Sequence, residues 1–143
     1  MRTRYRLERD VSAPSTARDV VEDVVAELGS RAADARIIAS ELVANSVRHS
    51  DAPAARPIEL EVEFDADFVK IEVCDAGSGY ETDAVKRRPA GHDGGFGLLL
   101  VAELSDAWGV SGNGGTCAWA LLDRTKAPPS TARDAAGLGA APR

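Results

Sequence analysis

The sequence contains little cysteine and has no cysteine pattern of a known metal or disulfide class. Cys74 and Cys117 are the only two cysteines among 143 residues. They lack the C-x-x-C spacing of a zinc site, and their density is far below that of a small secreted disulfide scaffold. Both stand in apolar stretches typical of strands. We therefore expect buried thiols in a protein of a reducing compartment.

Long apolar runs and a basic surface are also missing. No uninterrupted apolar stretch approaches the roughly 20 residues that a membrane-spanning helix needs, and no basic-then-apolar leader opens the chain. Seventeen Lys and Arg against 23 Asp and Glu give a net charge of −6. Such a balance argues against broad binding to nucleic acid or to an anionic membrane. We expect a cytoplasmic protein that contacts neither directly.

The length and the apolar periodicity predict one domain with helices and strands in separate runs. A chain of 143 residues can bury one real core but not two comfortable ones. We expect a single domain over residues 1–124, and a disordered tail over residues 125–143, which have too little apolar mass to fold. Periodicity and turn residues predict the following elements: a strand within 2–11, helices over 15–29 and 30–50, a hairpin of 58–64 and 69–73, and a second hairpin of 107–111 and 116–122.

A polar stripe lies on the second of these helices. Glu41, Asn45 and His49 follow one another at intervals of four residues and therefore share one side of the helix. The other sides are almost wholly apolar, which is typical of a buried helix. A carboxylate and an amide on such a helix need partners, because burying either one unpaired costs several kcal/mol.

Two interpretations of this stripe remain open on the residues alone. In a purely structural one, Asn45 caps or cross-links backbone, and Glu41 pairs with Arg36 or Arg48. In a functional one, the stripe faces a ligand. For His49 we favour a structural role, in which it complements the helix dipole at the carboxyl end.

Three glycine-containing motifs follow downstream. Asp75-x-Gly77-x-Gly79 comes directly after a predicted strand, Gly95-x-Gly97 opens a short apolar helix, and Gly115-Thr116 opens the last strand. A glycine turn before a helix lets backbone N–H groups approach an anion, and the helix dipole favours negative charge there. A glycine-rich segment can also simply turn a corner. No Gly-Lys-Ser/Thr follows, so this is not a P-loop.

Taken in order, the Glu41-x-x-x-Asn45 helix and the three glycine motifs resemble the GHKL ATPase superfamily, named for gyrase, Hsp90, histidine kinases and MutL. Within it the sequence is most similar to the stand-alone anti-sigma serine kinases of the RsbW and SpoIIAB type. The resemblance covers about Val20 to Leu122. It implies the Bergerat ATP-binding fold, an α+β two-layer sandwich with helices on one face of a mixed, mainly antiparallel sheet.

The resemblance also implies a role for each motif residue toward ATP and Mg2+. Glu41 would be the catalytic general base, and Asn45 would ligate Mg2+ through its side-chain oxygen. Asp75 would accept a hydrogen bond from the adenine amine, supported by Thr116. The remaining expected nucleotide contacts are Gly77, Gly79, Gly95, Phe96, Gly97 and Leu98. Residues 78–94 would form a lid, in which Lys86, Arg87 and Arg88 either reach a phosphate or, as we favour, form a solvated charge run.

Two functions follow from this resemblance. The first is an ATP-dependent serine/threonine protein kinase that phosphorylates a small anti-sigma antagonist of the STAS type, sequesters a sigma factor, or does both. The alternative is a non-catalytic module in which nucleotide occupancy controls binding of a partner protein. A homodimer is also implied by the resemblance, through the first strand and helix.

Overall fold

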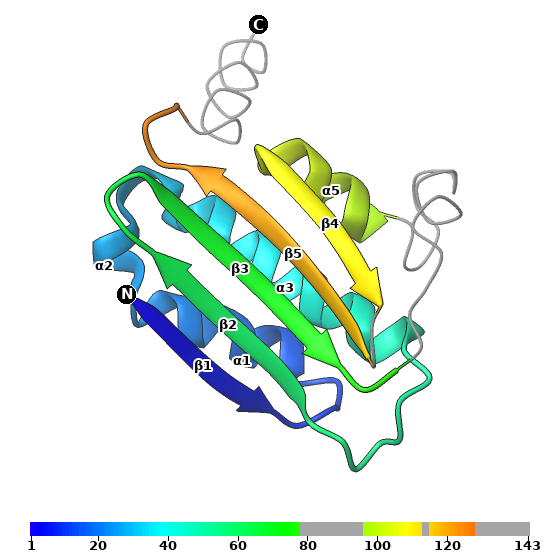
Figure 1. Ribbon diagram of the computed structural model, residues 1–143. Helices are drawn as coiled ribbons and strands as arrows, with labels where there is room; N and C mark the ends of the chain where they lie inside the picture. The colour runs from blue at the N-terminus through cyan, green and yellow to red at the C-terminus, as the bar shows by residue number, and fades with distance from the viewer. Residues whose placement is uncertain (78–95, 113–114, 128–143) are drawn as a thin grey trace, which may run out of the picture.

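The structure, a computed structural model, describes residues 1–77, 96–112 and 115–127. Its sheet has five strands in the order β1-β2-β3-β5-β4. The strands are β1 (Arg2–Leu7), β2 (Ile58–Phe64), β3 (Phe68–Asp75), β4 (Ala107–Gly112) and β5 (Thr116–Asp123). All four pairings between these strands are antiparallel. Figure 1 shows β1 and β4 at the two edges of the sheet.

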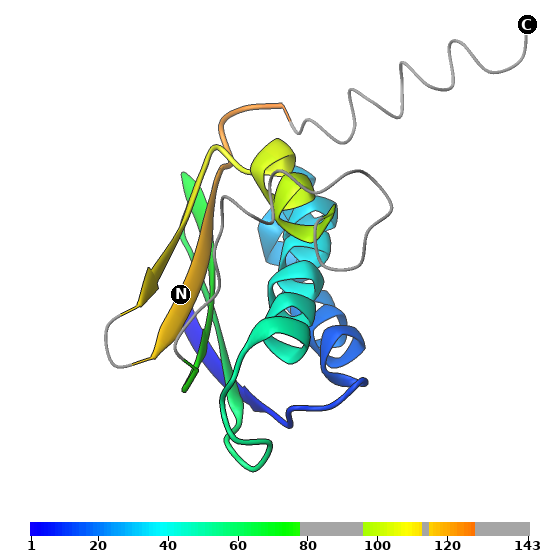
Figure 2. The same cartoon turned by 90° about the vertical axis from the view of Figure 1, so that its right-hand side faces the viewer.

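The helices form a single layer on one face of this sheet (Figure 2). They are α1 (Ala13–Glu22), α2 (Val25–Leu28), the 3-10 turn η1 (Gly29–Arg31), α3 (Ala32–His49) and α5 (Phe96–Leu104). Helix α3 packs against β2, β3 and β5, with α1 and α5 beside it. The expected two-layer α+β sandwich is confirmed, with α3 as its central helix.

Alternating apolar residues explain why the sheet has one packed face. Ile58, Leu60 and Val62 of β2 and Ile71 of β3 are buried against the helices, at 1% exposure or less. Their neighbours along each strand point to the opposite, open face, as the two-residue period of a strand requires. The hairpin predicted from this alternation is confirmed by the β2 to β3 pairing.

The amino-terminal elements begin and end differently from the prediction. Strand β1 ends at Leu7, so Val11 lies outside it and is 94% exposed. Helix α1 begins at Ala13, ahead of the expected start at Ser15, and includes Pro14 in its first turn. Proline is tolerated there because the first N–H groups of a helix have no intrahelical partner. The expected single helix up to Gly29 is divided into α1 and α2, while the apolar face continues through Val21 and Leu28.

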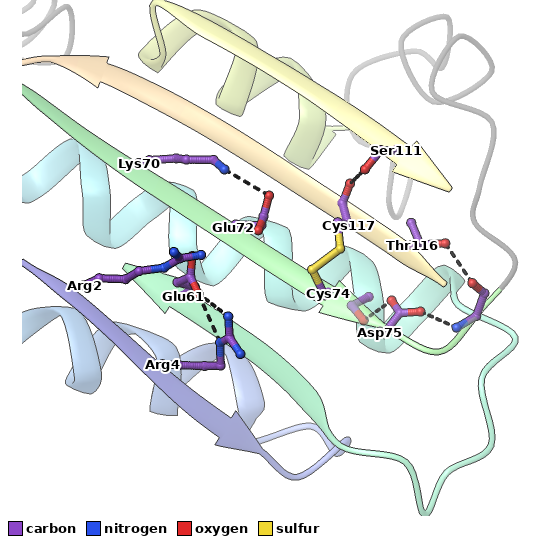
Figure 3. Close-up of a disulfide and its surroundings, with 12 residues drawn as sticks. Arg2, Arg4, Glu61, Lys70, Glu72, Cys74, Asp75, Ser111, Thr116 and Cys117 are labelled. Carbon is purple, nitrogen blue, oxygen red and sulfur yellow. Dashed lines mark hydrogen bonds and ion pairs between the residues drawn. A yellow bond between two sulfur atoms is a disulfide. The ribbon is translucent and has the colours of Figure 1, made fainter. Parts of the chain in front are cut away.

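Cys74 and Cys117 are not free thiols, which corrects the sequence-based expectation. They are directly opposed in the β3 to β5 register, with their Cα atoms 4.0 Å apart, and they form a disulfide (Figure 3). Both are half-buried on the open face of the sheet. The sequence indicates the apolar setting of each cysteine. It does not indicate the register of β3 against β5, which places the two cysteines opposite each other. The expected reducing compartment therefore loses the support that free thiols would have provided.

Two expectations lie wholly or partly outside the described residues. The lid over 78–94 belongs to the undescribed ranges, and only 125–127 of the tail are described. Among the helices that the structure does describe, none combines the length and apolarity that crossing a bilayer requires.

A charged ladder covers the open face along β1 and β2. Arg2, Arg4 and Arg6 stand opposite Glu63, Glu61 and Glu59 in the register. Glu61 is central and only 6% exposed, with Arg2 Nη2 at 2.8 Å and Arg4 Nη2 at 2.7 Å from its carboxylate oxygens (Figure 3). The hydrogen bond from Arg2, followed by that from Arg4, lowers the pKa of Glu61 below its ordinary value of 4.5, against the effect of burial.

This shift predicts a pH-dependent contribution of Glu61 to stability. Because its pKa is lower in the folded protein, the stabilisation is present above about pH 4.5 and is lost as the pH falls through the folded-state pKa. We expect Glu61→Gln to unfold more easily than the wild type at pH 7, with the difference shrinking at pH 3, as measured by urea unfolding. The control is Glu59→Gln, whose looser 3.6 Å pair with Arg6 should matter less. Equal pH dependence in the wild type and Glu61→Gln would contradict the assignment.

Candidate functional site

The polar stripe of α3 faces the beginning of α5. A methyl group built on Gly97 would lie 2.8 Å from Oε2 of Glu41 and 3.2 Å from Nδ2 of Asn45. Gly97 is buried in the first turn of α5, and the absence of a side chain there lets the two polar groups of α3 approach its backbone. Residues that are more than fifty positions apart in the chain therefore converge at the amino end of a helix.

Glu41 does not form the structural ion pair considered above. Arg36 instead contacts Glu22 of α1, at 2.8 Å. Within the described ranges, no hydrogen bond or ion pair involves the Glu41 carboxylate, which is half-buried. Its carboxylate thus lies beside Gly97, and no cation of the described residues pairs with it. Such a carboxylate is available to accept a proton or a hydrogen bond from a ligand.

Asn45 is 1% exposed, and its Nδ2 atom has no hydrogen-bond partner among the described residues. An unpaired buried polar group costs about 1–3 kcal/mol, so a bound ligand that engages this amide would recover that cost. The described residues contain no group of three or more His, Cys, Asp or Glu side chains able to hold a metal ion. The unpaired Nδ2 can donate to a phosphate oxygen of a ligand. The side-chain oxygen of the same amide, together with ligand phosphates and waters, is a ligand set that suits Mg2+. The residues present therefore fit a magnesium-bound phosphate compound at the amino end of α5.

Asp75 marks the second part of the site, at the end of β3. Its Oδ2 accepts a hydrogen bond from Ser46 Oγ at 2.5 Å, and its Oδ1 accepts one from Ser50 Oγ at 2.7 Å. The backbone N–H of Gly77 also donates to Oδ1, at 2.7 Å. Figure 3 shows this carboxylate at the end of β3, beside Thr116 at the start of β5.

Thr116 and two glycines complete this second part. Thr116 pairs with Asp75 in the register, and its Oγ1 donates to the carbonyl oxygen of Gly77 at 2.9 Å. Gly115 has a φ of 148°, and a methyl group on it would lie 2.7 Å from the Asp75 carbonyl oxygen. A methyl group on Gly77 would collide with Ser50 Oγ. Both glycines are therefore required for the close approach of these segments.

Helix α3 joins the two parts, because Asn45 and Ser46 are consecutive and Glu41 lies one turn earlier. A pocket of about 430 Å³ opens beside the second part, and its lining includes Gly77, Gly115 and the loop 51–53. Cavities of this size are in the range that small-molecule sites occupy. One end of the site has the Glu41 carboxylate, which has no partner among the described residues, and the buried Asn45 amide. The other end has the Asp75 carboxylate, which Ser46, Ser50 and Gly77 hold by hydrogen bonds.

Some expected site residues cannot be placed in this geometry. Gly79 and Gly95 lie outside the described residues, as do Lys86, Arg87 and Arg88. Phe96 is the first residue of α5, but its side chain is not described. Leu98 is fully buried in the core at 0% exposure, so only its backbone could contact a ligand. The nucleotide-binding and catalytic roles of all these residues stay predictions.

Sequence reasoning missed three residues that shape the site: Ser46, Ser50 and Arg9. Arg9 donates to the carbonyl oxygens of Ser46 at 2.8 Å, Ser50 at 3.1 Å and Ala52 at 3.1 Å, and so holds the carboxyl end of α3. The only sequence signal was that Ser46 follows Asn45 directly and that Ser50 ends the helix. His49 lies in the last turn of α3, the position in which a charged imidazole would complement the helix dipole, and this role stays a prediction.

Comparison with known proteins identifies the family to which this fold and site belong. The family model of the histidine kinase-like ATPase domain matches residues 7–122, and the chain belongs to this family. The matched range includes every described residue of the candidate site. The match confirms the GHKL-type ATPase resemblance, and supports an ATP-binding module of the ATPase or kinase class.

A solved structure shares the fold. The RsbU and RsbW domains of Rv1364c from Mycobacterium tuberculosis superpose with a TM-score of 0.64 at 22% identity, over 85% of this chain. The chain spans 32% of the length of that structure, so the likeness concerns one part of a larger protein. None of the curated proteins matches the chain.

Proposed function

We propose that the protein is a Mg-ATP-dependent serine/threonine protein kinase of the anti-sigma type, which phosphorylates a small antagonist protein of the STAS class and sequesters a sigma factor. The observation that carries this proposal is that Glu41 and Asn45 of α3 meet Gly97 at the amino end of α5, while the next residue of α3, Ser46, contacts Asp75. Asp75 ends β3 and pairs with Thr116 at the start of β5. The family match, with its ATP-binding fold, supports the nucleotide class.

Asp75, Gly77 and Thr116 would bind the base. A carboxylate that accepts from the exocyclic amine of adenine disfavours guanine, which has a carbonyl oxygen at that position. Gly97 and the first N–H groups of α5 would bind the phosphates, because these groups lack intrahelical partners and the helix dipole favours anions. Asn45 would hold Mg2+, which supplies charge neutralisation on the phosphates.

Glu41 would act on the hydroxyl group of the partner protein. As the oxygen of a partner Ser or Thr forms a bond to the γ-phosphorus, the bond between that phosphorus and the ADP oxygen breaks, and Glu41 takes the hydroxyl proton. Glu41 suits this role because no described cation neutralises it and because it lies beside Gly97.

Transfer of label tests this proposal. The full chain is incubated with Mg2+, ATP labelled at the γ-phosphate and a STAS-type antagonist, and the products are mapped to single residues. We expect label on one Ser or Thr of the antagonist. If nucleotide and antagonist both bind but no label is transferred, the protein is a nucleotide-controlled binding module and the kinase proposal is wrong.

A further inference from the structure

The Asp75 carboxylate has almost no acceptor capacity left for a ligand. Each carboxylate oxygen offers two acceptor positions. Oδ1 receives both Ser50 Oγ and the Gly77 N–H, so both of its positions are used. Among the described residues, Oδ2 receives only Ser46 Oγ, which leaves one position. With respect to these residues, an incoming donor can therefore be accepted at one place, on Oδ2.

The two serine hydroxyl groups that define this place are themselves fixed. Ser46 is 3% exposed, and its carbonyl oxygen accepts from Arg9 at 2.8 Å. Ser50 Oγ accepts from the Ala52 N–H at 3.2 Å while donating to Asp75, and its carbonyl oxygen also accepts from Arg9. Both serines therefore lie at the carboxyl end of α3, which Arg9 holds in place. Without the serine hydroxyl groups, the Asp75 side chain would be freer to rotate about its own bonds.

Ser46 differs in this from another buried serine of the same helix. Ser40, which is 6% exposed, donates to the carbonyl oxygen of Ile37 within α3, a common use of a helical serine. Ser46 instead donates across to β3, over a separation of 29 residues. The hydroxyl group at position 46 is therefore committed to the carboxylate and not to its own helix.

We propose that Ser46 and Ser50 are positioning residues that set the base specificity of the site, by holding Asp75 so that a single acceptor position on Oδ2 faces an exocyclic amine. This inference rests on the proposed nucleotide-binding function. An acceptor whose position is already fixed binds an amine without a further cost of ordering its side chain. The same fixed acceptor cannot rotate away from a carbonyl oxygen at that point, so a base with a carbonyl group there binds more weakly. Both effects favour adenine over a base with a carbonyl group there.

The experiment compares Mg-ATP with Mg-ITP, whose base has a carbonyl oxygen in place of the adenine amine. Dissociation constants are measured by calorimetry for the wild type, Ser46→Ala and Ser50→Ala, with Ser40→Ala as the matched buried control. We expect the preference for ATP over ITP to fall about tenfold in each of the first two variants, the size of one lost hydrogen bond to a charged group. It should stay unchanged in Ser40→Ala.

The ratio of the two affinities separates positioning from a structural role. If Ser46→Ala and Ser50→Ala weaken both nucleotides equally, or leave both unchanged, the serines only connect α3 to β3 and the inference is wrong. The same follows if Ser40→Ala lowers the preference as much. If the wild type binds neither nucleotide, the proposed function itself fails, which is a different result from binding with an unaltered preference. Thermal unfolding of each variant verifies that the measured protein is folded.

Discussion

Glu41→Gln is expected to lower the rate of phosphoryl transfer to the antagonist by about 10²–10⁴-fold, the usual contribution of a general base. Glutamine keeps the size of the side chain and can still accept a hydrogen bond, but it cannot take the proton of the attacking hydroxyl group. The position beside Gly97, without a described ion pair, is what makes Glu41 the candidate. Single-turnover transfer of labelled phosphate measures the rate.

Binding of Mg-ATP should be nearly unchanged in the same variant, because the proton transfer belongs to the reaction and not to binding. Glu63→Gln is the control, since Glu63 belongs to the charged ladder of β1 and β2, on the face of the sheet that alternates with the packed one. Undiminished transfer by Glu41→Gln, with normal ATP affinity, would show that another group accepts the proton.

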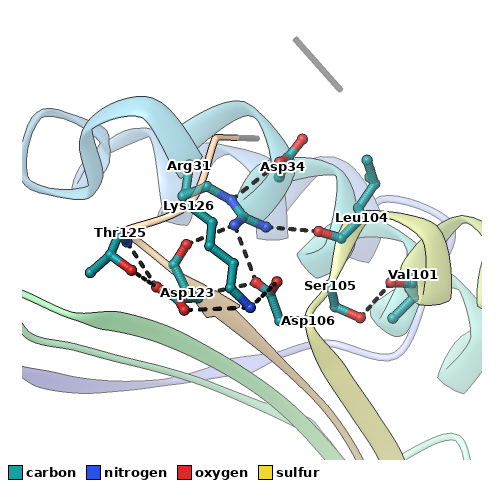
Figure 4. Close-up of polar contacts among 9 residues, drawn as sticks. All are labelled: Arg31, Asp34, Val101, Leu104, Ser105, Asp106, Asp123, Thr125 and Lys126. Carbon is teal, nitrogen blue, oxygen red and sulfur yellow. Dashed lines mark hydrogen bonds and ion pairs between the residues drawn. The ribbon is translucent and has the colours of Figure 1, made fainter. Parts of the chain in front are cut away.

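Arg31→Met is expected to lower the free energy of unfolding by about 3–5 kcal/mol, the range measured when one partner of a buried charge cluster is removed. Arg31 is 1% exposed and donates to the carbonyl oxygens of Leu104 at 2.9 Å and Asp123 at 2.8 Å. It also pairs with Asp34 at 3.4 Å and Asp106 at 3.2 Å (Figure 4). Because Asp34 is fully buried, removal of Arg31 would leave it without its cation.

The matched control for Arg31 is Arg36→Met. Arg36 pairs with Glu22 at 2.8 Å, but the two side chains are 41% and 53% exposed, so the loss should be no more than about 1 kcal/mol. The double variant Arg31→Met/Asp34→Leu should recover much of the stability, since it removes both buried charges. Urea unfolding at pH 7 measures all three. Equal losses in Arg31→Met and Arg36→Met would contradict the role of the buried cluster.

Arg31 also connects this stability to the site. Leu104 is the last residue of α5, Asp106 immediately precedes β4, and Asp123 is the last residue of β5. The Arg31 guanidinium group therefore connects these three positions to the start of α3. The position of α5 relative to α3 determines how Gly97 meets Glu41 and Asn45. We therefore regard the cluster as the support on which the end of the site at Gly97 depends.

The parts of the molecule that could be predicted from sequence are those with local signals. The four-residue spacing of Glu41 and Asn45 places them on one side of a helix, and the alternation over Ile58–Phe64 predicts a strand with one packed face. Turn and helix-start glycines, such as Gly97 and Gly115, follow from their neighbours in the chain. These signals lie within a few residues of one another.

Contacts between distant segments could not be predicted in the same way. The hydrogen bond from Ser46 to Asp75 spans 29 residues, and that from Arg31 to the Asp123 carbonyl oxygen spans 92. The disulfide depends on the register of β3 against β5, which no local pattern specifies for strands joined by a long segment. The order of the motifs indicated a shared site, but not how its carboxylate is held.

The claim that Asp75 reads an adenine base is tested most directly by calorimetry of the full chain with Mg-ATP, Mg-ADP and Mg-GTP, alongside Asp75→Asn. We expect ATP and ADP to bind, GTP to bind at least tenfold more weakly, and Asp75→Asn to lose about 10–100-fold in ATP affinity, as expected for a hydrogen bond to a charged acceptor. Equal affinity for ATP and GTP, or an Asp75→Asn protein that binds ATP as the wild type does, would contradict the account.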